Sequence, residues 1–238
     1  MELPILYRDE DVVVVNKSSG LLVHRSSIDK KADVFAMQVV RDQLNQHVFP
    51  VHRLDRPTSG ALVFALSSEA AKNLAAEFSE GRVTKVYKAI VRGTPPDDVT
   101  LDYPLKEELD EIADAQARSD KPAQPALTVF ERLKTYEFPV SVDKFPTARY
   151  SLVKAVPKTG RKHQIRRHLR HLGHPIIGDV NHGSGKHNRF FREHFGVSRL
   201  WLACTEISFL HPRENRKVQI HAPLADEFQR VLEMMGWN

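Results

Sequence analysis

One carboxylate, Asp55, lies between two arginines in residues 51–60, which read Val-His-Arg-Leu-Asp-Arg-Pro-Thr-Ser-Gly. Pro57 fixes its own φ angle and biases the residue before it toward extended geometry, while Gly60 permits backbone shapes that other residues avoid. Fixed positive charge on both sides favours the ionised form of Asp55 near neutral pH. This carboxylate is therefore a candidate reactive group, and a solvated aspartate in an ordinary turn is the alternative.

A second candidate functional segment, residues 157–169, reads Pro-Lys-Thr-Gly-Arg-Lys-His-Gln-Ile-Arg-Arg-His-Leu. We predict a helix that follows Gly160 and ends near Leu172, where Gly173 and Pro175 stop it. On that helix Ile165, Leu169 and Leu172 form a narrow apolar seam. Arg166 borders the seam and can be half-buried and aimed inward, whereas Arg167 and Arg170 face solvent or a ligand.

Charge is segregated along the chain. Net charge is +5, and nine lysines and arginines with no acidic residue occupy residues 144–178. Residues 97–114 invert the pattern, with eight acidic side chains opposed only by Lys106. A basic segment of this kind suits a phosphate-binding face, because each neutralised phosphate releases counterions. A solvated basic helix surface is the alternative.

Apolar patterning predicts the elements that hold these stretches. Strands are expected at residues 12–15, 61–66, 84–92, 126–133, 148–156, 200–210 and 218–221. Helices are expected at residues 32–46, with Val34, Met37, Val40 and Leu44 at helical spacing, after a cap at Ser67 and Ser68, and from residue 224. The acidic stretch that runs to residue 125 shows little periodicity, and we expect it to form loops.

Cysteine content and the distribution of apolar residues indicate the cellular compartment of the protein. The chain has 238 residues and a single cysteine, Cys204, which excludes an internal disulfide and fits a reducing environment. Neither a secretory apolar region nor an apolar run near the length of a membrane helix is present in the sequence. We therefore expect a cytoplasmic protein, organised as a single domain over residues 1–238.

Three separated motifs resemble one known family. They are Asn-Lys-Ser-Ser-Gly at residues 16–20, with serine where the family usually has proline, the Asp55 segment, and Thr-Gly-Arg-Lys-His-Gln-Ile-Arg at residues 159–166. Together they are similar to the pseudouridine synthases related to ribosomal large subunit pseudouridine synthase A. The resemblance implies an α+β pseudouridine synthase fold: a curved, mixed, mostly antiparallel sheet flanked by helices, with a central active-site cleft. Because the first motif begins at Asn16, we expect the small N-terminal RNA-binding domain that many relatives carry to be absent.

By resemblance, the reaction isomerises uridine in RNA to pseudouridine. Asp55 would be the nucleophile or base, Arg166 would pair with it, and Tyr87, in a Lys-x-Tyr context, would pack on the base. The expected RNA-binding residues are Arg53, Lys85, Arg161, Lys162, Arg167 and Arg170. Flanking segments, such as Leu-Asp-Tyr-Pro-Leu at residues 101–105, resemble the subgroup that modifies the uridine at position 65 of tRNA.

The isomerisation needs no oxidant and no external nucleophile, so neither a cofactor nor a metal is implied. The segment that holds the histidines at positions 163, 168, 171 and 174 lacks a His-Glu-x-x-His motif, and its cationic residues oppose a bound cation. We therefore expect these histidines to meet phosphates or solvent. RNA, most simply tRNA, is the expected partner, with no membrane and no obligate protein. A ribosomal RNA pseudouridine synthase and a non-catalytic RNA-binding or RNA-folding module are the alternatives.

Overall fold

The structure is a computed structural model of the 238-residue chain. It describes residues 1–24, 34–108 and 122–237, and these separate into two compact units. The first unit comprises residues 1–85, 104–125 and 204–223, and the second comprises residues 86–103, 126–203 and 224–238. Among the described residues, no helix has both the length and the apolar character needed to cross a membrane.

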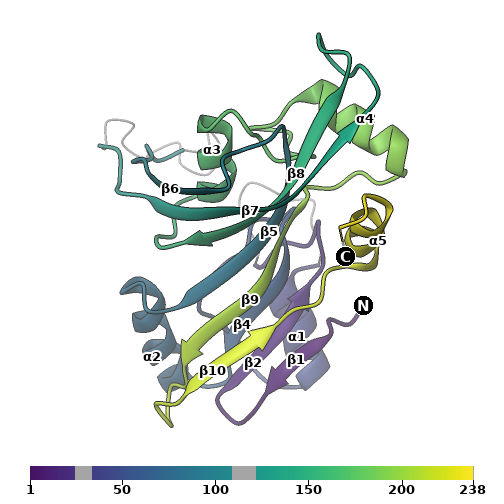
Figure 1. Cartoon of the computed structure of the whole chain (residues 1–238). Helices are drawn as coiled ribbons and strands as arrows, with labels where there is room; N and C mark the ends of the chain where they lie inside the picture. Colours follow the sequence, from purple (N-terminus) through teal and green to yellow (C-terminus); the bar gives the residue numbers. More distant parts are fainter. Residues whose placement is uncertain (25–33, 109–121, 238) are drawn as a thin grey trace. The chain divides into compact units, whose positions relative to one another are not determined.

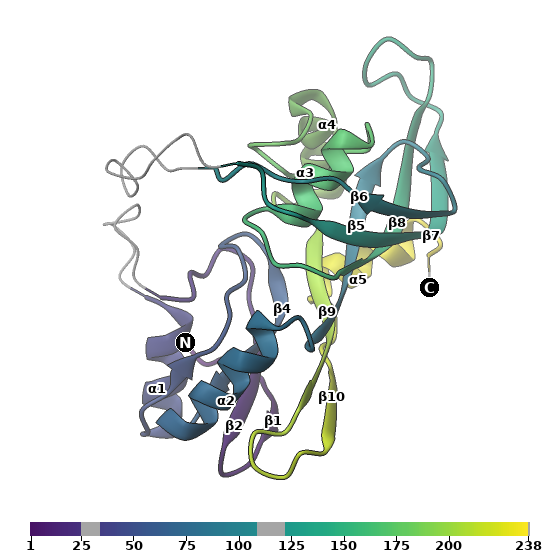
Figure 2. The ribbon, with the colours of Figure 1, turned by 90° about the vertical axis from the view of Figure 1, so that its left-hand side faces the viewer.

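In the residues that the structure describes, the first unit is a sheet with the helices α1 and α2. Its strand order is β1-β2-β4-β9, with β10 paired to β9 and the short β3 paired to β4. Figure 2 shows α1 and α2 on one face of these strands. The bounds are β1 Ile5–Arg8, β2 Val12–Lys17, α1 Ala36–Leu44, β3 Phe49–Pro50, β4 Ser59–Ala65, α2 Ser68–Ser79, β9 Leu202–Leu210 and β10 Lys217–His221.

Strands β2 and β4 form the buried centre of this unit. They pair antiparallel from Val12 opposite Ala65 to Lys17 opposite Gly60. The four consecutive valines of β2 and all seven residues of β4 are buried. An unbroken apolar run is what a strand covered on both faces requires. The paired ends at Lys17 and Gly60 place two of the sequence motifs beside each other.

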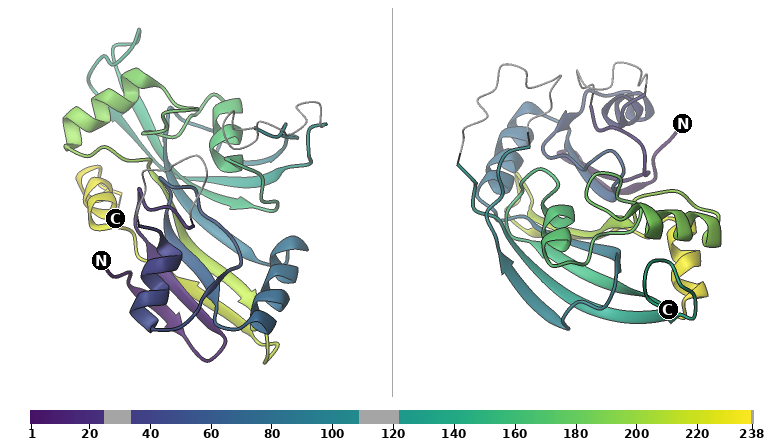
Figure 3. Two further views of the ribbon diagram at one scale, coloured as in Figure 1. Left: turned by 180° about the vertical axis from the view of Figure 1, so that it is seen from behind. Right: turned by 90° about the horizontal axis from the view of Figure 1, so that it is seen from above.

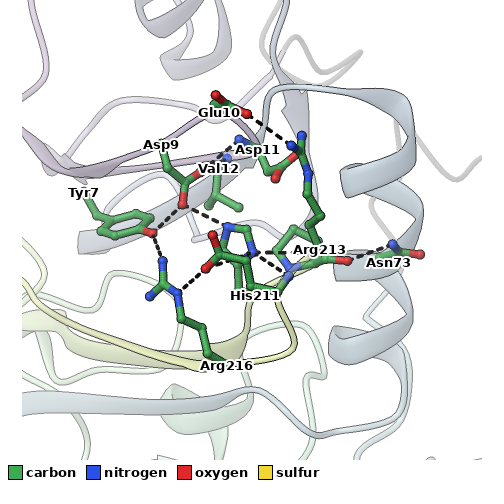
Figure 4. Close-up of polar contacts among 11 residues, drawn as sticks. Tyr7, Asp9, Glu10, Asp11, Val12, Asn73, His211, Arg213 and Arg216 are labelled. Carbon is green, nitrogen blue, oxygen red and sulfur yellow. Dashed lines mark hydrogen bonds and ion pairs between the residues drawn. The ribbon is translucent and has the colours of Figure 1, made fainter.

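A polar network joins the tips of the two hairpins in this unit (Figure 4). The Nε2 atom of His211 lies 2.9 Å from Oδ2 of Asp9, and Nδ1 of His211 accepts from the backbone N–H groups of Arg213 and Glu214. Because Nδ1 accepts, Nε2 carries the proton and donates to Asp9. The Tyr7 hydroxyl also donates to Asp9. The turn after β1 is thereby tied to the turn after β9.

The second unit is an antiparallel sheet with the helices α3, α4 and α5, which Figure 1 labels. Its strand order is β5-β8-β7-β6. The bounds are β5 Thr84–Arg92, β6 Asp98–Asp102, β7 Leu127–Phe138, β8 Ala148–Pro157, α3 Gln164–His171, α4 Gly185–Phe195 and α5 Asp226–Met234.

Helices α4 and α5 enclose the aromatic core of the second unit. Phe191 and Phe195 of α4 and Phe228 of α5 pack with Tyr150 of β8 and with Trp201. Figure 3 shows the two helices side by side. Residues four apart on a helix share a face, which explains why Phe191 and Phe195 enter the same core. Helix α4 was not expected from the sequence, although that spacing, followed by Gly196 at φ +69°, marks its buried face and its end.

Two of the expected elements need correction. The acidic stretch expected to form loops contains β6, which pairs with β7 along Asp98–Asp102. β6 is the last strand in the order, and only Val99 and Leu101 are half-buried, so its apolar signal is short. Helix α1 buries Ala36, Val39 and Val40, while Val34 precedes the helix and is exposed. The remaining parts of these two expectations, at residues 109–121 and 32–33, lie outside the described residues.

The other expected strands and helices are confirmed, with ends that differ by one or two residues, except that β7 runs five residues beyond its expected end to Phe138. Ser67 caps α2, because its hydroxyl accepts from the backbone N–H of Ala70 at 3.1 Å. Helix α3 starts four residues after Gly160 and ends at His171. The expected α+β class is also confirmed.

Candidate active site

Asp55 lies in the first unit, in the turn that leads into β4. The carbonyl of Asp55 accepts a hydrogen bond from the backbone N–H of Thr58 at 3.0 Å, which closes the turn around Pro57. The Asp55 side chain is half-exposed, while Thr58 and Ser59 are buried. Gly60 has φ +111°, and a Cβ atom there would lie 2.0 Å from the carbonyl oxygen of Cys204. Only glycine fits that position, so the strand can follow the turn at once.

The first motif braces the Asp55 turn. Lys17 is fully buried, and its Nζ atom donates to the carbonyls of Ser18 at 2.9 Å, Leu21 at 2.7 Å and Arg56 at 3.1 Å. The Arg56 carbonyl also accepts from the backbone N–H of Gly20 at 2.9 Å. A buried ammonium needs such acceptors to offset its desolvation. The residue after Asp55 is thereby fixed to the loop of residues 18–21.

Further contacts reinforce this brace. The Ser19 hydroxyl donates to the carbonyl of Pro57 at 2.7 Å, and Nε of Arg56 donates to the carbonyl of Gly20 at 3.0 Å. Gly20 adopts φ +86°, so it forms the turn expected there despite Ser18 in the usual proline position. Hydrogen bonds therefore run in both directions between the first motif and the Asp55 turn.

His52, in the Asp55 segment, has a structural role that the sequence did not predict. Its Nε2 accepts from the backbone N–H of Val63 at 3.0 Å, and its ring stacks on Phe78 of α2, with centroids 4.5 Å apart. Burial and then the charge of Lys85 lower the pKa of His52 to about 3. His52 is therefore neutral, with its proton on Nδ1, and it anchors the segment to β4 and α2.

Lys85, expected to bind RNA, lies against the same aromatic ring. Its Nζ is 5.7 Å from the centroid of Phe78, and burial lowers the pKa of the ammonium. Arg53, the other expected RNA-binding residue of this unit, is exposed. Their roles toward RNA stay predictions.

Arg166 lies in the second unit, on α3, and forms a bidentate ion pair with Asp179. Its Nε donates to Oδ2 at 2.6 Å and its Nη2 to Oδ1 at 2.8 Å. Arg166 is only 4% exposed, so it is buried more deeply than its place at the border of the apolar seam predicted. Burial opposes ionisation of Asp179, but hydrogen bonds from Arg166 and from two backbone N–H groups hold its pKa below the usual value. The guanidinium is thus charged and fixed in orientation.

The turn that carries Asp179 is itself rigid. Gly178 has φ +79°, and a Cβ atom there would lie 1.7 Å from the carbonyl oxygen of Arg199. The Asn188 side chain of α4 accepts from the N–H of Gly178 at 2.8 Å and donates to the carbonyl of Asp179 at 2.9 Å. Asp179 was not expected to have a role, although it follows the third motif in the chain.

Gln164 explains the spacing inside the third motif. Its Oε1 accepts from the Thr159 hydroxyl at 2.7 Å and from the N–H of Arg161 at 3.0 Å. Its Nε2 donates to the carbonyl of Leu127 at 3.0 Å and to the hydroxyl of Thr128 at 2.9 Å. The start of α3 is thereby fastened to β7, which holds the helix that carries Arg166.

The histidines of this region differ from the expectation. His168 is fully buried, which corrects the prediction that it meets phosphate or solvent. Its Nδ1 bonds with the Thr128 hydroxyl and its Nε2 with the carbonyl of Tyr103, each at 3.0 Å. Burial lowers its pKa, and nearby His171 and Arg167 act in the same direction. His174 bonds through Nδ1 to the carbonyl of Arg92, while His163 bonds through Nδ1 to His182.

The remaining predicted site residues of the second unit lie on β5 and around α3. Tyr87 is 8% exposed and pairs with Ala155 in the β5–β8 ladder. Arg161 and Arg170 are exposed, and Lys162 and Arg167 are half-buried. The structure thus presents a braced carboxylate in one unit and, in the other, an anchored guanidinium on a helix with cationic neighbours. That Arg166 also pairs with Asp55 stays a prediction.

Comparison with known proteins connects this arrangement to a family. The profile of the family described as RNA pseudouridylate synthase matches residues 11–171. Three curated relatives are named tRNA pseudouridine synthase C. The protein of Vibrio cholerae is 53% identical over 99% of this chain and 97% of its own length. The protein of Haemophilus ducreyi is 50% identical over 100% of this chain and 98% of its own length. The protein of Salmonella typhi is 52% identical over 99% of this chain and 91% of its own length.

Two human structures share the fold. Human RNA pseudouridylate synthase domain containing 1 aligns with a TM-score of 0.71 at 24% identity, covering 100% of this chain and 96% of its own. Human RNA pseudouridylate synthase domain containing 4 aligns with a TM-score of 0.73 at 24% identity, covering 98% and 93%.

Proposed function

This chain belongs to the RNA pseudouridylate synthase family, and from that premise we propose that it isomerises a uridine of tRNA to pseudouridine, with Asp55 as the catalytic carboxylate. The observation that carries the proposal is the Asp55 turn: a half-exposed carboxylate followed by Arg56 and Pro57, whose carbonyls are held by Lys17, Gly20 and Ser19. Relatives about half identical along their full length carry the name tRNA pseudouridine synthase C, which supports tRNA as the substrate.

The proposed reaction breaks the N1–C1′ glycosidic bond of uridine and rejoins the base to C1′ through C5. The target nucleotide first leaves its stack. Asp55 then attacks C1′, or acts as a base toward a glycal intermediate. The base rotates, C5 bonds to C1′, the proton leaves C5 and N1 regains one. Rigidity of the Asp55 turn favours this chemistry, because a positioned reactant loses little further entropy in the transition state.

The other roles follow the family resemblance. Tyr87 packs on the base and assists removal of the C5 proton. Arg53 fills the gap that the flipped base leaves. Arg166 holds the reactive carboxylate, and the cations Lys85, Arg161, Lys162, Arg167 and Arg170 bind the RNA backbone. The proposed target is the uridine at position 65 of tRNA.

The test uses an unmodified tRNA transcript that contains uridine labelled with tritium at C5. We expect the wild-type protein to release tritium and to form pseudouridine at position 65 without other components. Asp55→Asn keeps the size of the side chain but lacks a carboxylate. It should release no tritium while its Kd for the transcript stays within a few-fold of the wild-type value. Formation of pseudouridine by Asp55→Asn would show that Asp55 is not the catalytic carboxylate.

The same assay distinguishes the alternatives. Conversion of a ribosomal RNA fragment with the tRNA transcript inert would identify a ribosomal RNA enzyme. Tight RNA binding without tritium release from either RNA would identify a non-catalytic module.

A further inference from the structure

Tyr103 and His171 form an exposed stack at the junction of β6 and α3. Their ring centroids are 3.8 Å apart and their planes differ by 24°. Tyr103 is 40% exposed, and His171 is exposed as well. Figures 1 and 2 both show α3 beside the end of β6, the strand that leads into Tyr103. Both residues therefore present solvent-accessible surface at the stack.

The main chain beneath this stack is fixed by buried hydrogen bonds. The Tyr103 N–H donates to the carbonyl of Ala126 at 3.0 Å. The Tyr103 carbonyl accepts from Nε2 of His168, whose Nδ1 in turn accepts from the Thr128 hydroxyl. Thr128 accepts from Gln164, the side chain that fastens α3 to β7. A directed chain of hydrogen bonds therefore leads from α3 to the backbone that presents the tyrosine.

The charges on the α3 side of the stack favour an anion. On α3, Arg167 lies four residues before His171 and so shares its face of the helix, and exposed Arg170 adjoins His171. On the β6 side, Tyr103 follows Asp98 and Asp102 and precedes Glu107 and Glu108, so the cations of the stack come from α3. Two arginines beside a rigid aromatic surface combine the two features that bind single-stranded nucleic acid, a cationic track for phosphates and a platform for bases.

We propose that the Tyr103–His171 stack, here called the aromatic platform, binds an unpaired base of the substrate RNA by stacking, while Arg167 and Arg170 hold the flanking phosphates. The proposal rests on the proposed function in that RNA is the substrate. It adds a binding subsite that acts through the face of a base rather than through charge. Because the platform is already ordered, stacking requires little further loss of side-chain entropy.

Binding of the unmodified tRNA transcript tests the aromatic platform. Tyr103→Leu keeps an apolar side chain and both main-chain hydrogen bonds but removes the ring. We expect it to raise the Kd about 10-fold, within the range that loss of one stacked base produces, with an unchanged dependence of Kd on salt. Tyr103→Trp should keep the wild-type Kd. Tyr136→Leu, at a comparably exposed tyrosine of β7, is the matched control and should have no effect.

A cross-linking experiment gives a second readout. Irradiation of a transcript that contains 5-iodouridine should attach a base to the peptide that carries Tyr103, as identified by mass spectrometry, and Tyr103→Leu should abolish that product. A wild-type Kd for Tyr103→Leu, or cross-links confined to other peptides, would overturn the proposal. If the wild-type protein binds the transcript without converting it, the proposed function fails while the platform is still tested. If it does not bind RNA, both fail.

Discussion

At the scale of single residues, the contact that Arg166 makes with Asp179 depends on the shape of the guanidinium as well as on its charge. Its guanidinium meets Asp179 through two parallel hydrogen bonds inside the protein. Lysine retains the charge but offers a point donor on a flexible stem, so it cannot reproduce the bidentate contact. We expect Arg166→Lys to lose most of the activity, measured as the single-turnover rate of pseudouridine formation at saturating enzyme.

Arg167→Ala is the matched control, because Arg167 is the next residue and is half-buried rather than buried. It should weaken RNA binding and leave the single-turnover rate near the wild-type value, since saturating enzyme removes the binding contribution. A slower single-turnover rate for Arg167→Ala than for Arg166→Lys would show that the active arginine has been misassigned.

At the scale of elements, the network in Figure 4 joins two hairpins through Asp9. Burial raises the pKa of Asp9, but hydrogen bonds from Tyr7, from the N–H groups of Asp11 and Val12, and from His211 leave it below its usual value. A lowered pKa means that this stabilisation is present above pH 3.8, the ordinary value, and is lost as pH falls through the folded-state value. The wild-type protein therefore loses the stabilisation from ionised Asp9 only at acidic pH.

Asp9→Asn should lower the free energy of unfolding at pH 7 by about 1–2 kcal/mol, because an amide nitrogen cannot accept from His211 or Tyr7. Urea denaturation at pH 7 and at pH 3 measures the free energy of unfolding of both proteins. The difference between Asp9→Asn and wild type should be smaller at pH 3. Asp42→Asn is the control, since Asp42 pairs only with its exposed neighbour Arg41 among the contacts described. A gap that stays constant with pH would contradict the role given to the Asp9 carboxylate.

The elements also show what a sequence can and cannot predict. Valines 12–15 predicted β2, and the serines at positions 67 and 68 predicted the start of α2, because burial and capping are local signals. β6 was missed because an edge strand with two half-buried apolar residues lacks such a signal. His168 was misjudged because its burial depends on Thr128 and Tyr103, which are distant in the chain.

The same limit applies to the candidate site. Motif resemblance predicts roles for Asp55 and Arg166, but spacing alone could not reveal the contacts that hold the Asp55 turn and Arg166. Lys17 reaches the carbonyl of Arg56 across 39 residues, and Asp179 reaches Arg166 across 13. Such contacts depend on how the chain folds back, so the bracing of the site became apparent only in three dimensions.

At the scale of the whole molecule, electrostatic affinity for RNA should come from the basic segment of residues 144–170. Nine lysines and arginines lie there, but Arg166 is engaged by Asp179, whereas Arg161 and Arg170 are exposed. If about five phosphates are contacted, log K should fall against log salt concentration with a slope of roughly −3.5 to −4.5, which spans single-stranded and duplex RNA.

The test of this prediction compares the salt dependence of RNA binding after loss of exposed arginines in the basic segment with that after loss of an exposed arginine near acidic residues. The double substitution of Arg161 and Arg170 by alanine should reduce the size of that slope by about 1.5, since two phosphate contacts are lost. Arg230→Ala is the control, because Arg230 is exposed on α5 and lies three residues from Glu227 and from Glu233, which disfavour a phosphate there. Filter binding of the tRNA transcript across a salt series measures all three proteins. An unchanged slope for the double variant, or an equal reduction for Arg230→Ala, would mean that RNA docks on another face.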